Sequence, residues 1–230
     1  MSPSPLRLGS WLVIGDVMDP SHTNKPRLKS RFDKALKYAS KLHRTQIREG
    51  GKVPYVAHLL GVAALVLEEG GDEDEAIAAL LHDAVEDQGG RRRFADIRRR
   101  FGKRVARIVE ACSDSDTIPK PPWRERKEKY LARIRHEPAD VRRVSLADKL
   151  YNARSILADY RRVGDKVWKR FTGRKQGTLW YYRELVKAFR EVGPHLMAEG
   201  LGRVVTQLER LARRRPAKRP SSPRQARRAG

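Results

Sequence analysis

A helical period, interrupted by pairs of glycines, runs through most of the chain and constrains its fold more than any other feature. From Lys29 onward apolar residues recur every three or four positions, and no stretch shows the sustained alternation of a strand. Gly50-Gly51, Gly70-Gly71 and Gly89-Gly90 are expected to end the first three helices. The pattern therefore predicts an all-α helical bundle.

The third of these helices is expected to be the central one. Asp72 followed by Glu75 has the spacing of a capping box, in which each side chain bonds the other residue's backbone at a helix start. From Ala76 to about Asp87 the helix is apolar almost all round until His82. A helix of this kind belongs in a core, because it has no polar face to turn toward water.

The charge of the chain is strongly positive and unevenly placed. Lys and Arg number 51 against 28 Asp and Glu, giving a formal net charge of +23, and eight of the cations lie in the last twenty residues. We expect an N-terminal extension at 1–28, one folded domain at 29–211 and a basic disordered tail at 212–230. A basic body indicates anionic partners such as phosphorylated small molecules or nucleic acid.

Cysteine content and hydropathy indicate the compartment. Cys112 is the single cysteine, so the chain has no internal disulfide. The N-terminus lacks the pattern of a secretory signal, and charge interrupts every apolar stretch before it reaches membrane-spanning length. We expect a cytoplasmic protein without membrane contact; the sequence does not indicate an oligomeric state.

An adjacent His-Asp pair near the end of the apolar helix is the first sign of a functional site. His82 and Glu86 are four residues apart, as are Asp83 and Asp87, so the acids of one turn lie beside the His-Asp pair of the turn before. A lone His-Asp pair is usually an ion pair with an ordinary core histidine. Here the charges fall on a helix expected to be buried, where a compensating cation is needed. The pattern therefore favours a metal site.

Two further residues fit the same site. Asp148 follows Val141 and Val144 on the apolar face of a long helix beginning at Pro138, with Lys149 expected to point elsewhere. His58 lies on the apolar stripe of the second helix and by itself would be a core histidine. Imidazole and carboxylate together suit a divalent transition ion. Such an ion lowers the pKa of bound water, and a carboxylate one turn away can exchange protons with that water.

Three ordered segments carry a resemblance to a known family. They are Pro54-Tyr-Val-Ala-His58, Ala78-Ala-Leu-Leu-His-Asp-Ala-Val-Glu-Asp87 and Leu146-Ala-Asp-Lys-Leu-Tyr-Asn152. The chain resembles the HD-domain metal-dependent phosphohydrolases, and within them the RelA/SpoT hydrolase domain and the small alarmone hydrolases of the MESH1 type. This resemblance implies an HD-domain helical bundle that hydrolyses (p)ppGpp at its 3′-diphosphate, releasing pyrophosphate and GDP or GTP.

The resemblance also implies roles for individual residues. One Mn²⁺ would be bound by four ligands, namely His58, His82, Asp83 and Asp148. Glu86 and Asp87 would do the acid–base work. The substrate contacts would be Arg48 on the guanine, Asn152 on the ribose and Lys120 on a phosphate.

Two alternatives stay open on the sequence. The same metal site acting on another nucleotide, such as the 2′-phosphate of NADPH, needs no change in the ligands. A nucleic-acid-binding protein with a vestigial site would explain the basic tail, although a binding module has no need of five buried ionisable groups. Contact of the tail with RNA or the ribosome is also compatible with catalysis.

Overall fold

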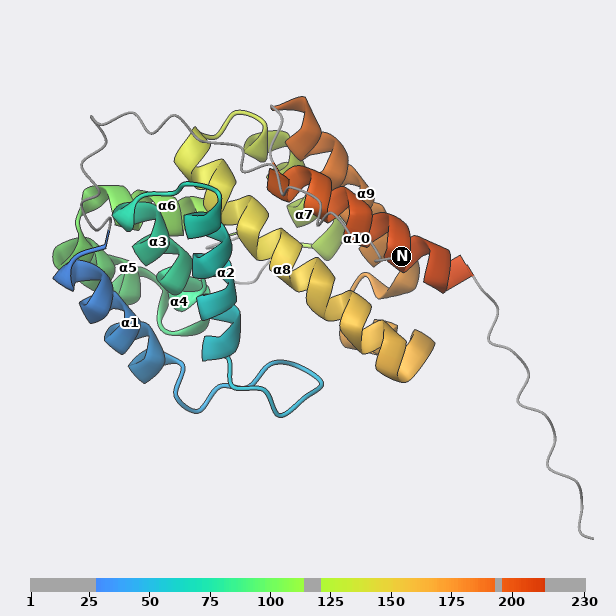
Figure 1. The fold of residues 1–230 in the computed structure, drawn as a ribbon, viewed down its shortest axis with the longest axis horizontal. Coiled ribbons are helices and arrows are strands. Elements are labelled where there is room, and N and C mark those ends of the chain that lie inside the picture. The colour runs from blue at the N-terminus through green and yellow to red at the C-terminus, as the bar shows by residue number, and fades with distance from the viewer. Residues whose placement is uncertain (1–27, 114–120, 193–195, 214–230) are drawn as a thin grey trace, which may run out of the picture.

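The computed structural model describes residues 28–113, 121–192 and 196–213, and every regular element among them is helical (Figure 1). The all-α prediction is thus confirmed. The elements are α1 Ser30–Leu42, α2 Val56–Glu68, α3 Glu73–Leu81, α4 Ala84–Asp87, α5 Gly90–Phe101, α6 Lys103–Cys112, α7 Trp123–Ile134, α8 Ala139–Val163, the 3₁₀ helix η1 Gly164–Arg170, α9 Arg174–Glu191 and α10 Leu196–Arg213.

The long helix α8 is the axis of the fold. In Figure 1 it runs diagonally, with α1 to α6 on one side and α9 and α10 on the other. It packs against α2, α3 and α6 in the first group and against α10 and η1 in the second. A residue on α8 can therefore face side chains from both halves of the chain.

Local signals in the sequence set most helix ends. The capping box at the start of α3 is confirmed, because Asp72 Oδ1 accepts from the Glu75 backbone N–H at 3.1 Å and Glu75 Oε2 accepts from the Asp72 N–H at 2.8 Å. Gly102 separates α5 from α6 with a φ of +94°, a conformation that glycine adopts without strain. As expected, the stretch that contains His82 ends just before Gly89-Gly90, since α4 ends at Asp87. The expectation for Gly50-Gly51 was wrong, because α1 already ends at Leu42.

The expected continuous helix from Ala76 to Asp87 is interrupted. α3 ends at Leu81, His82 and Asp83 form a turn, and α4 begins at Ala84. The backbone of Asp83, at φ −92° and ψ −6°, departs from helical values. On a regular helix adjacent side chains point about 100° apart, so this break lets two neighbouring residues face one point.

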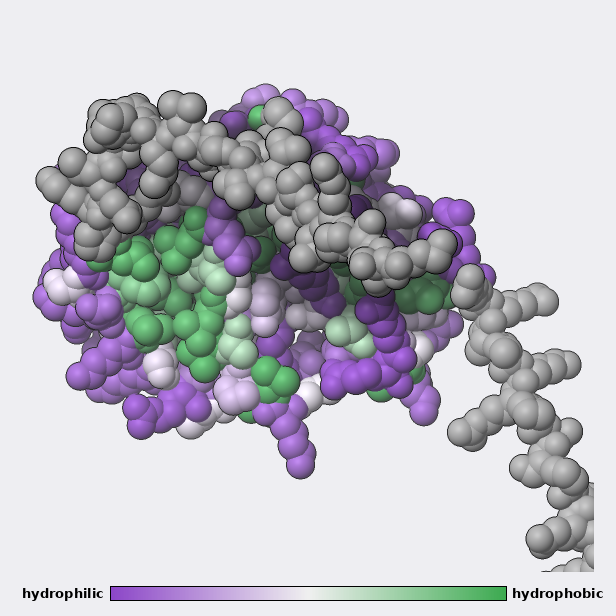
Figure 2. Space-filling model, in the orientation of Figure 1, coloured by the Kyte–Doolittle hydropathy of each residue, from purple (hydrophilic) through white to green (hydrophobic). Residues whose placement is uncertain are grey.

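Apolar side chains fill the space between the helices, and polar ones cover most of the outside. Every residue of α3 from Ala76 to Leu81 is fully buried, as expected for a central helix. Figure 2 shows hydrophilic residues over much of the described surface, with an apolar area in the region of α1 to α3. Among the described residues, no helix combines the length and apolar character needed to cross a bilayer.

Candidate metal centre

Two buried histidines from different helices meet at their ring nitrogens. His58 lies on α2 and His82 follows α3, and their Nε2 atoms are 3.3 Å apart. The His82 Nδ1 atom lies 2.8 Å from the Ala79 carbonyl oxygen, to which it donates. That bond fixes the ring and leaves the Nε2 lone pair free for a cation.

Two carboxylates complete the cluster. Asp83 Oδ2 lies 3.0 Å from His82 Nε2 and 3.4 Å from His58 Nε2. Asp148 Oδ1, on α8, lies 3.2 Å from His58 Nε2 and 3.5 Å from His82 Nε2. The four residues expected to bind a metal thus come together, although they belong to three separate segments.

The spacing of these atoms fits a single divalent cation. Ligand atoms bonded to one ion at about 2.1 Å lie about 3.0 to 3.4 Å from one another, depending on the coordination geometry. The contacts between the two imidazoles and from each carboxylate to them lie between 3.0 and 3.5 Å, close to this range. His58, His82 and Asp148 are all buried, where a cation would offset the repulsion and desolvation of the carboxylates.

The charges of the cluster shift the proton affinities of its members. Burial opposes charging of His82, but Asp83 and Asp148 outweigh it and raise the pKa of His82 well above its usual value. Burial likewise opposes ionisation of Asp148, yet Lys149 and the two histidines hold the pKa of that carboxyl well below its usual range. The site without metal therefore favours two carboxylates beside a protonated imidazole.

Lys149 points toward the cluster, contrary to the expectation. Its Nζ atom donates to Asp148 Oδ2 at 2.6 Å and lies 5.1 Å from the centre of the Tyr130 ring on α7. α7 and α9 supply Tyr130 and Tyr181 beside it, and its side chain is only 17% exposed. The position of Lys149 on its helix did not indicate that its side chain is buried beside an ionised carboxylate.

Tyr55 was missed as a member of the site. Its hydroxyl donates to Asp83 Oδ2 at 2.6 Å, and its ring stacks on that of His43 at 5.2 Å. Burial and the charge of Asp83 raise the pKa of Tyr55, so the hydroxyl stays protonated and donates to the carboxylate. The spacing of Tyr55 three residues before His58, on one helical face, was the signal in the sequence.

Glu86 and Asp87 lie on α4, one turn beyond the His-Asp pair, and both are exposed. Asp87 accepts from Gln46 Nε2 at 2.8 Å, and Gln46 in turn bonds the buried His43 ring at 2.6 Å. Both carboxylates are thus in contact with solvent and can exchange protons with water, although neither lines the cleft described below.

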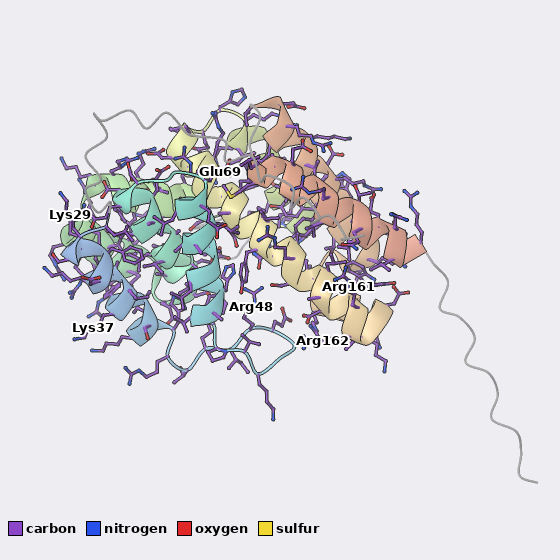
Figure 3. All side chains as sticks on the ribbon, viewed as in Figure 1. Lys29, Lys37, Arg48, Glu69, Arg161 and Arg162 are labelled. Atoms are coloured by element: carbon purple, nitrogen blue, oxygen red, sulfur yellow. The ribbon has the colours of Figure 1, made fainter. Side chains whose placement is uncertain are left out.

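A cleft of about 590 Å³ opens beside the cluster. Three of its lining residues touch metal-site carboxylates directly, namely Tyr55, Lys149 and Asn152. The wall also carries cations from distant parts of the chain, which are Arg48, Lys127, Lys149, Arg162 and Arg170. Figure 3 shows Arg48 between the start of α2 and α8, with Arg162 further along α8.

Arg48 and Asn152, both expected to bind substrate, are in contact. Arg48 Nη2 donates to Asn152 Oδ1 at 2.9 Å, and its guanidinium lies 5.6 Å from the centre of the Tyr151 ring. Asn152 Nδ2 donates to Asp148 Oδ1 at 2.6 Å. Lys120, the third expected contact, lies outside the described residues.

The far wall of the cleft was not foreseen. Arg170 Nη1 donates to Asp159 Oδ2 at 2.7 Å, and Arg162 pairs with the same carboxylate. The Arg170 guanidinium packs directly against Gly50. A Cβ atom on residue 50 would overlap with it. Nothing in the local sequence marks Arg170 as part of the cleft, because its position depends on η1 lying against the loop before α2.

The fold and the site define an all-helical protein with a buried His/Asp centre suited to a divalent metal. Residues 35–179 match the family model of the HD domain, and this chain belongs to that family. The matched range includes all four residues of the cluster and the helices α2, α3 and α8 that position them.

Two relatives whose names state an activity are similar to this chain in sequence over half of its length or more. The guanosine-3′,5′-bis(diphosphate) 3′-pyrophosphohydrolase MESH1 of Xenopus tropicalis is 38% identical over 169 residues, which are 72% of this chain and 87% of that protein. The Homo sapiens protein of the same name is 38% identical over 125 residues, covering 53% of this chain and 67% of its own length.

A solved structure agrees with these relatives. It is described as a metazoan ortholog of SpoT that hydrolyzes ppGpp, and it superposes with a TM-score of 0.64 at 26% identity. The superposition covers 78% of this chain and 96% of that one. The similarity therefore extends over nearly the whole of the compared protein.

Proposed function

We propose that this protein hydrolyses (p)ppGpp at the 3′-diphosphate, releasing pyrophosphate and GDP or GTP, with one Mn²⁺ held by His58, His82, Asp83 and Asp148. The observation that carries the proposal is the convergence of these ligand atoms, 3.0 to 3.5 Å apart, beside a cationic cleft. The similarity to proteins named as 3′-pyrophosphohydrolases specifies the substrate.

The cleft suits a nucleotide with several phosphates. Its volume of about 590 Å³ lies within the usual range for small-ligand sites. Five cations line it against the carboxylates of Glu49 and Asp159, so an anionic substrate gains charge pairing on entry. Arg48 stacks on or bonds the guanine, Asn152 bonds the ribose, and Lys120 contacts a phosphate.

The reaction needs two proton transfers, one from the attacking water and one to the leaving 3′ oxygen. The oxygen of a water molecule forms a bond to the phosphorus attached to the ribose 3′ oxygen, and the bond between that phosphorus and the 3′ oxygen breaks. Glu86 and Asp87 take the proton from the water and return one to the leaving 3′ oxygen. The divalent ion, when bound, would lower the pKa of the water and neutralise phosphate charge.

The direct test is product analysis with purified protein loaded with Mn²⁺. Incubation with ppGpp is expected to yield GDP and pyrophosphate in equal amounts. A parallel incubation with NADPH at matched concentration measures release of the 2′-phosphate. Faster turnover of NADPH would overturn the choice of substrate and leave the metal site intact.

Asp148→Asn tests the ligand assignment, because it removes the charge of the ligand and keeps the size of the side chain. We expect it to lose metal, measured by elemental analysis, and to lose activity by more than about a hundredfold. Full metal content and full activity in Asp148→Asn would contradict the ligand assignment. Activity of the stripped enzyme reconstituted with Mn²⁺, Zn²⁺, Mg²⁺ or Co²⁺ identifies the working ion.

Two further expectations stay predictions. One is the cytoplasmic location. The other is contact of the basic tail with RNA or the ribosome, which concerns residues outside the described part of the chain. A vestigial site, the remaining alternative, requires that the metal-loaded protein hydrolyse no nucleotide at all.

A further inference from the structure

The arginines of α5 exceed the acids that could neutralise them. The helix carries six arginines and one acid, Asp96. Three of the arginines, Arg93, Arg99 and Arg100, already gather on that carboxylate. Within the described residues Arg91, Arg92 and Arg98 have no acidic partner, and neither does Lys103 at the start of α6. These cations are free for an external anion.

A hollow of about 470 Å³ opens among these cations. Its lining is apolar at Phe94, Ala95 and Gly102, here called the floor, and cationic at Arg98, Arg99 and Lys103, here called the rim. Arg91 lies on the same face, because residues three, four and seven apart on a helix line up. Gly102 turns the chain from α5 into α6 with its positive φ and so brings Lys103 to the edge of the hollow.

An aromatic, apolar floor with a cationic rim matches the chemistry of an unpaired nucleotide. A nucleobase can stack on an aromatic ring, while guanidinium groups bind the flanking phosphates in paired hydrogen bonds. A base inside a duplex cannot reach such a floor, because it is stacked between its neighbours. We propose that the α5 face, with Phe94 at its centre, binds single-stranded nucleic acid.

An anionic membrane fits this face less well. A helix that binds a bilayer surface presents large apolar side chains for insertion. The exposed large apolar residues of the described chain lie elsewhere, at Ile47, Val53, Leu60, Val163 and Leu196. The many arginines also favour bidentate contacts with phosphate over the diffuse attraction that lysines provide.

The hollow on α5 and the proposed substrate cleft are separate, since they share no lining residue. The cleft is lined by the loop after α1 and by residues from α7 to α9, and none of these elements carries the hollow. The inference therefore does not depend on the hydrolysis reaction. Binding of nucleic acid can fail while ppGpp turnover is intact, and the reverse also holds.

Fluorescence anisotropy with labelled oligouridylate and oligoadenylate of about 12 nucleotides tests the proposal on the full chain. Arg91→Glu/Arg98→Glu reverses two exposed cations seven residues apart on α5. Arg203→Glu/Arg210→Glu makes the same change at the same spacing on α10 and is the matched control. We expect the α5 variant to bind at least about tenfold more weakly, with a shallower salt dependence, and the control to change by less than about twofold.

Phe94→Leu tests the floor of the hollow, since leucine keeps the apolar packing and removes the ring. We expect it to weaken oligonucleotide binding by about fivefold or more and to leave binding of inorganic polyphosphate unchanged. The same oligonucleotide made as DNA shows whether the ribose hydroxyl contributes. Circular dichroism and ppGpp turnover, measured on every variant, verify that the fold is retained.

Equal losses in the α5 and α10 variants would overturn the proposal, because binding would then follow the net charge of the chain. No loss in either variant would also overturn it, because the basic tail, present in both, would then dominate binding. An unchanged affinity in Phe94→Leu would reduce the hollow to a general anion surface and would also refute it. Tighter binding to vesicles of anionic lipid than to oligonucleotides, with the same loss in Arg91→Glu/Arg98→Glu, would assign the face to membranes instead.

Discussion

Arg48 and Asn152 are 104 residues apart in the chain and are joined by a hydrogen bond of 2.9 Å from Arg48 Nη2 to Asn152 Oδ1. Asn152 also donates to Asp148 Oδ1 at 2.6 Å. The loop after α1, the cleft and a metal-site carboxylate thus form one connected network. A substitution at Arg48 should therefore change the energetic contribution of Asn152, and the reverse.

A double-mutant cycle tests that coupling. Arg48→Ala and Asn152→Ala are each expected to lower kcat/KM for ppGpp about tenfold, because each removes a polar contact to the substrate. In the double variant the losses should combine to less than their product, with an interaction energy of about 0.5 to 3 kcal/mol. Arg48→Ala combined with Arg203→Ala, on remote α10, should show no such interaction. Multiplicative losses in the Arg48/Asn152 pair would mean that the two residues act independently.

Substitution of the acid–base residues should lower turnover without lowering metal content. Glu86→Gln and Asp87→Asn are expected to keep the metal, since neither side chain belongs to the ligand cluster. Turnover should fall about 10²- to 10⁴-fold, the usual contribution of a positioned acid or base. Metal content by elemental analysis and single-turnover rates measure the two effects. Asp33→Asn, at an exposed carboxylate on α1, is the control and should leave both unchanged. Loss of metal in Glu86→Gln would reassign that residue as a ligand.

The residues of the metal centre were predictable because each sits on an apolar helical face, where an ionisable side chain needs a partner. The burial argument holds for His58, His82 and Asp148, which are buried, whereas Asp83 is partly exposed and was indicated by its place beside His82 and by the family resemblance. Several helix ends, such as those near Gly70 and Gly102, followed glycine signals that act within a few residues. Both kinds of inference use only local sequence.

What escaped prediction depends on tertiary contacts. The break after Leu81 could not be read from a stretch in which every residue favours a helix. The direction of Lys149 depends on Tyr130, contributed by α7 across the interface. Arg170 reaches the cleft only because η1 brings it beside Gly50 of the loop before α2. In each case the deciding neighbour is far away in the sequence.

Metal binding should release a proton at neutral pH. Asp83 and Asp148 overcome the effect of burial and raise the pKa of His82 well above its usual value, so the metal-free site holds a proton that the cation must displace. Apparent affinity should therefore rise with pH, about tenfold per unit, and level off above that raised pKa. By the same linkage, the contribution of His82 to the stability of the metal-free fold is complete below about pH 6.5 and is lost as pH rises through the raised pKa. Isothermal titration of Mn²⁺ in two buffers of different ionisation enthalpy counts the protons. No release at pH 7 would show that His82 is neutral before the metal binds.

Lys149 should matter most when the metal is absent. Its Nζ atom neutralises the buried Asp148 carboxylate at 2.6 Å, and the two side chains are only 17% and 9% exposed. Lys149→Met keeps the length of the side chain and removes the charge, so the Asp148 carboxylate loses its ammonium partner. We expect the metal-stripped variant to lose about 3 to 5 kcal/mol of unfolding free energy, as broken buried pairs do. The Mn²⁺-loaded variant should lose clearly less, because the cation supplies the missing positive charge.

Urea unfolding in the presence of chelator and in the presence of Mn²⁺ measures this difference. Lys187→Met, which removes an exposed pair with Glu184 on α9, is the matched control and should change stability by less than about 1 kcal/mol in both states. An equal loss with and without metal would mean that Lys149 stabilises the fold through packing on Tyr130 alone. A larger loss in the loaded state would indicate that the ammonium group holds Asp148 in the orientation the cation requires, since removing it would then weaken metal binding itself.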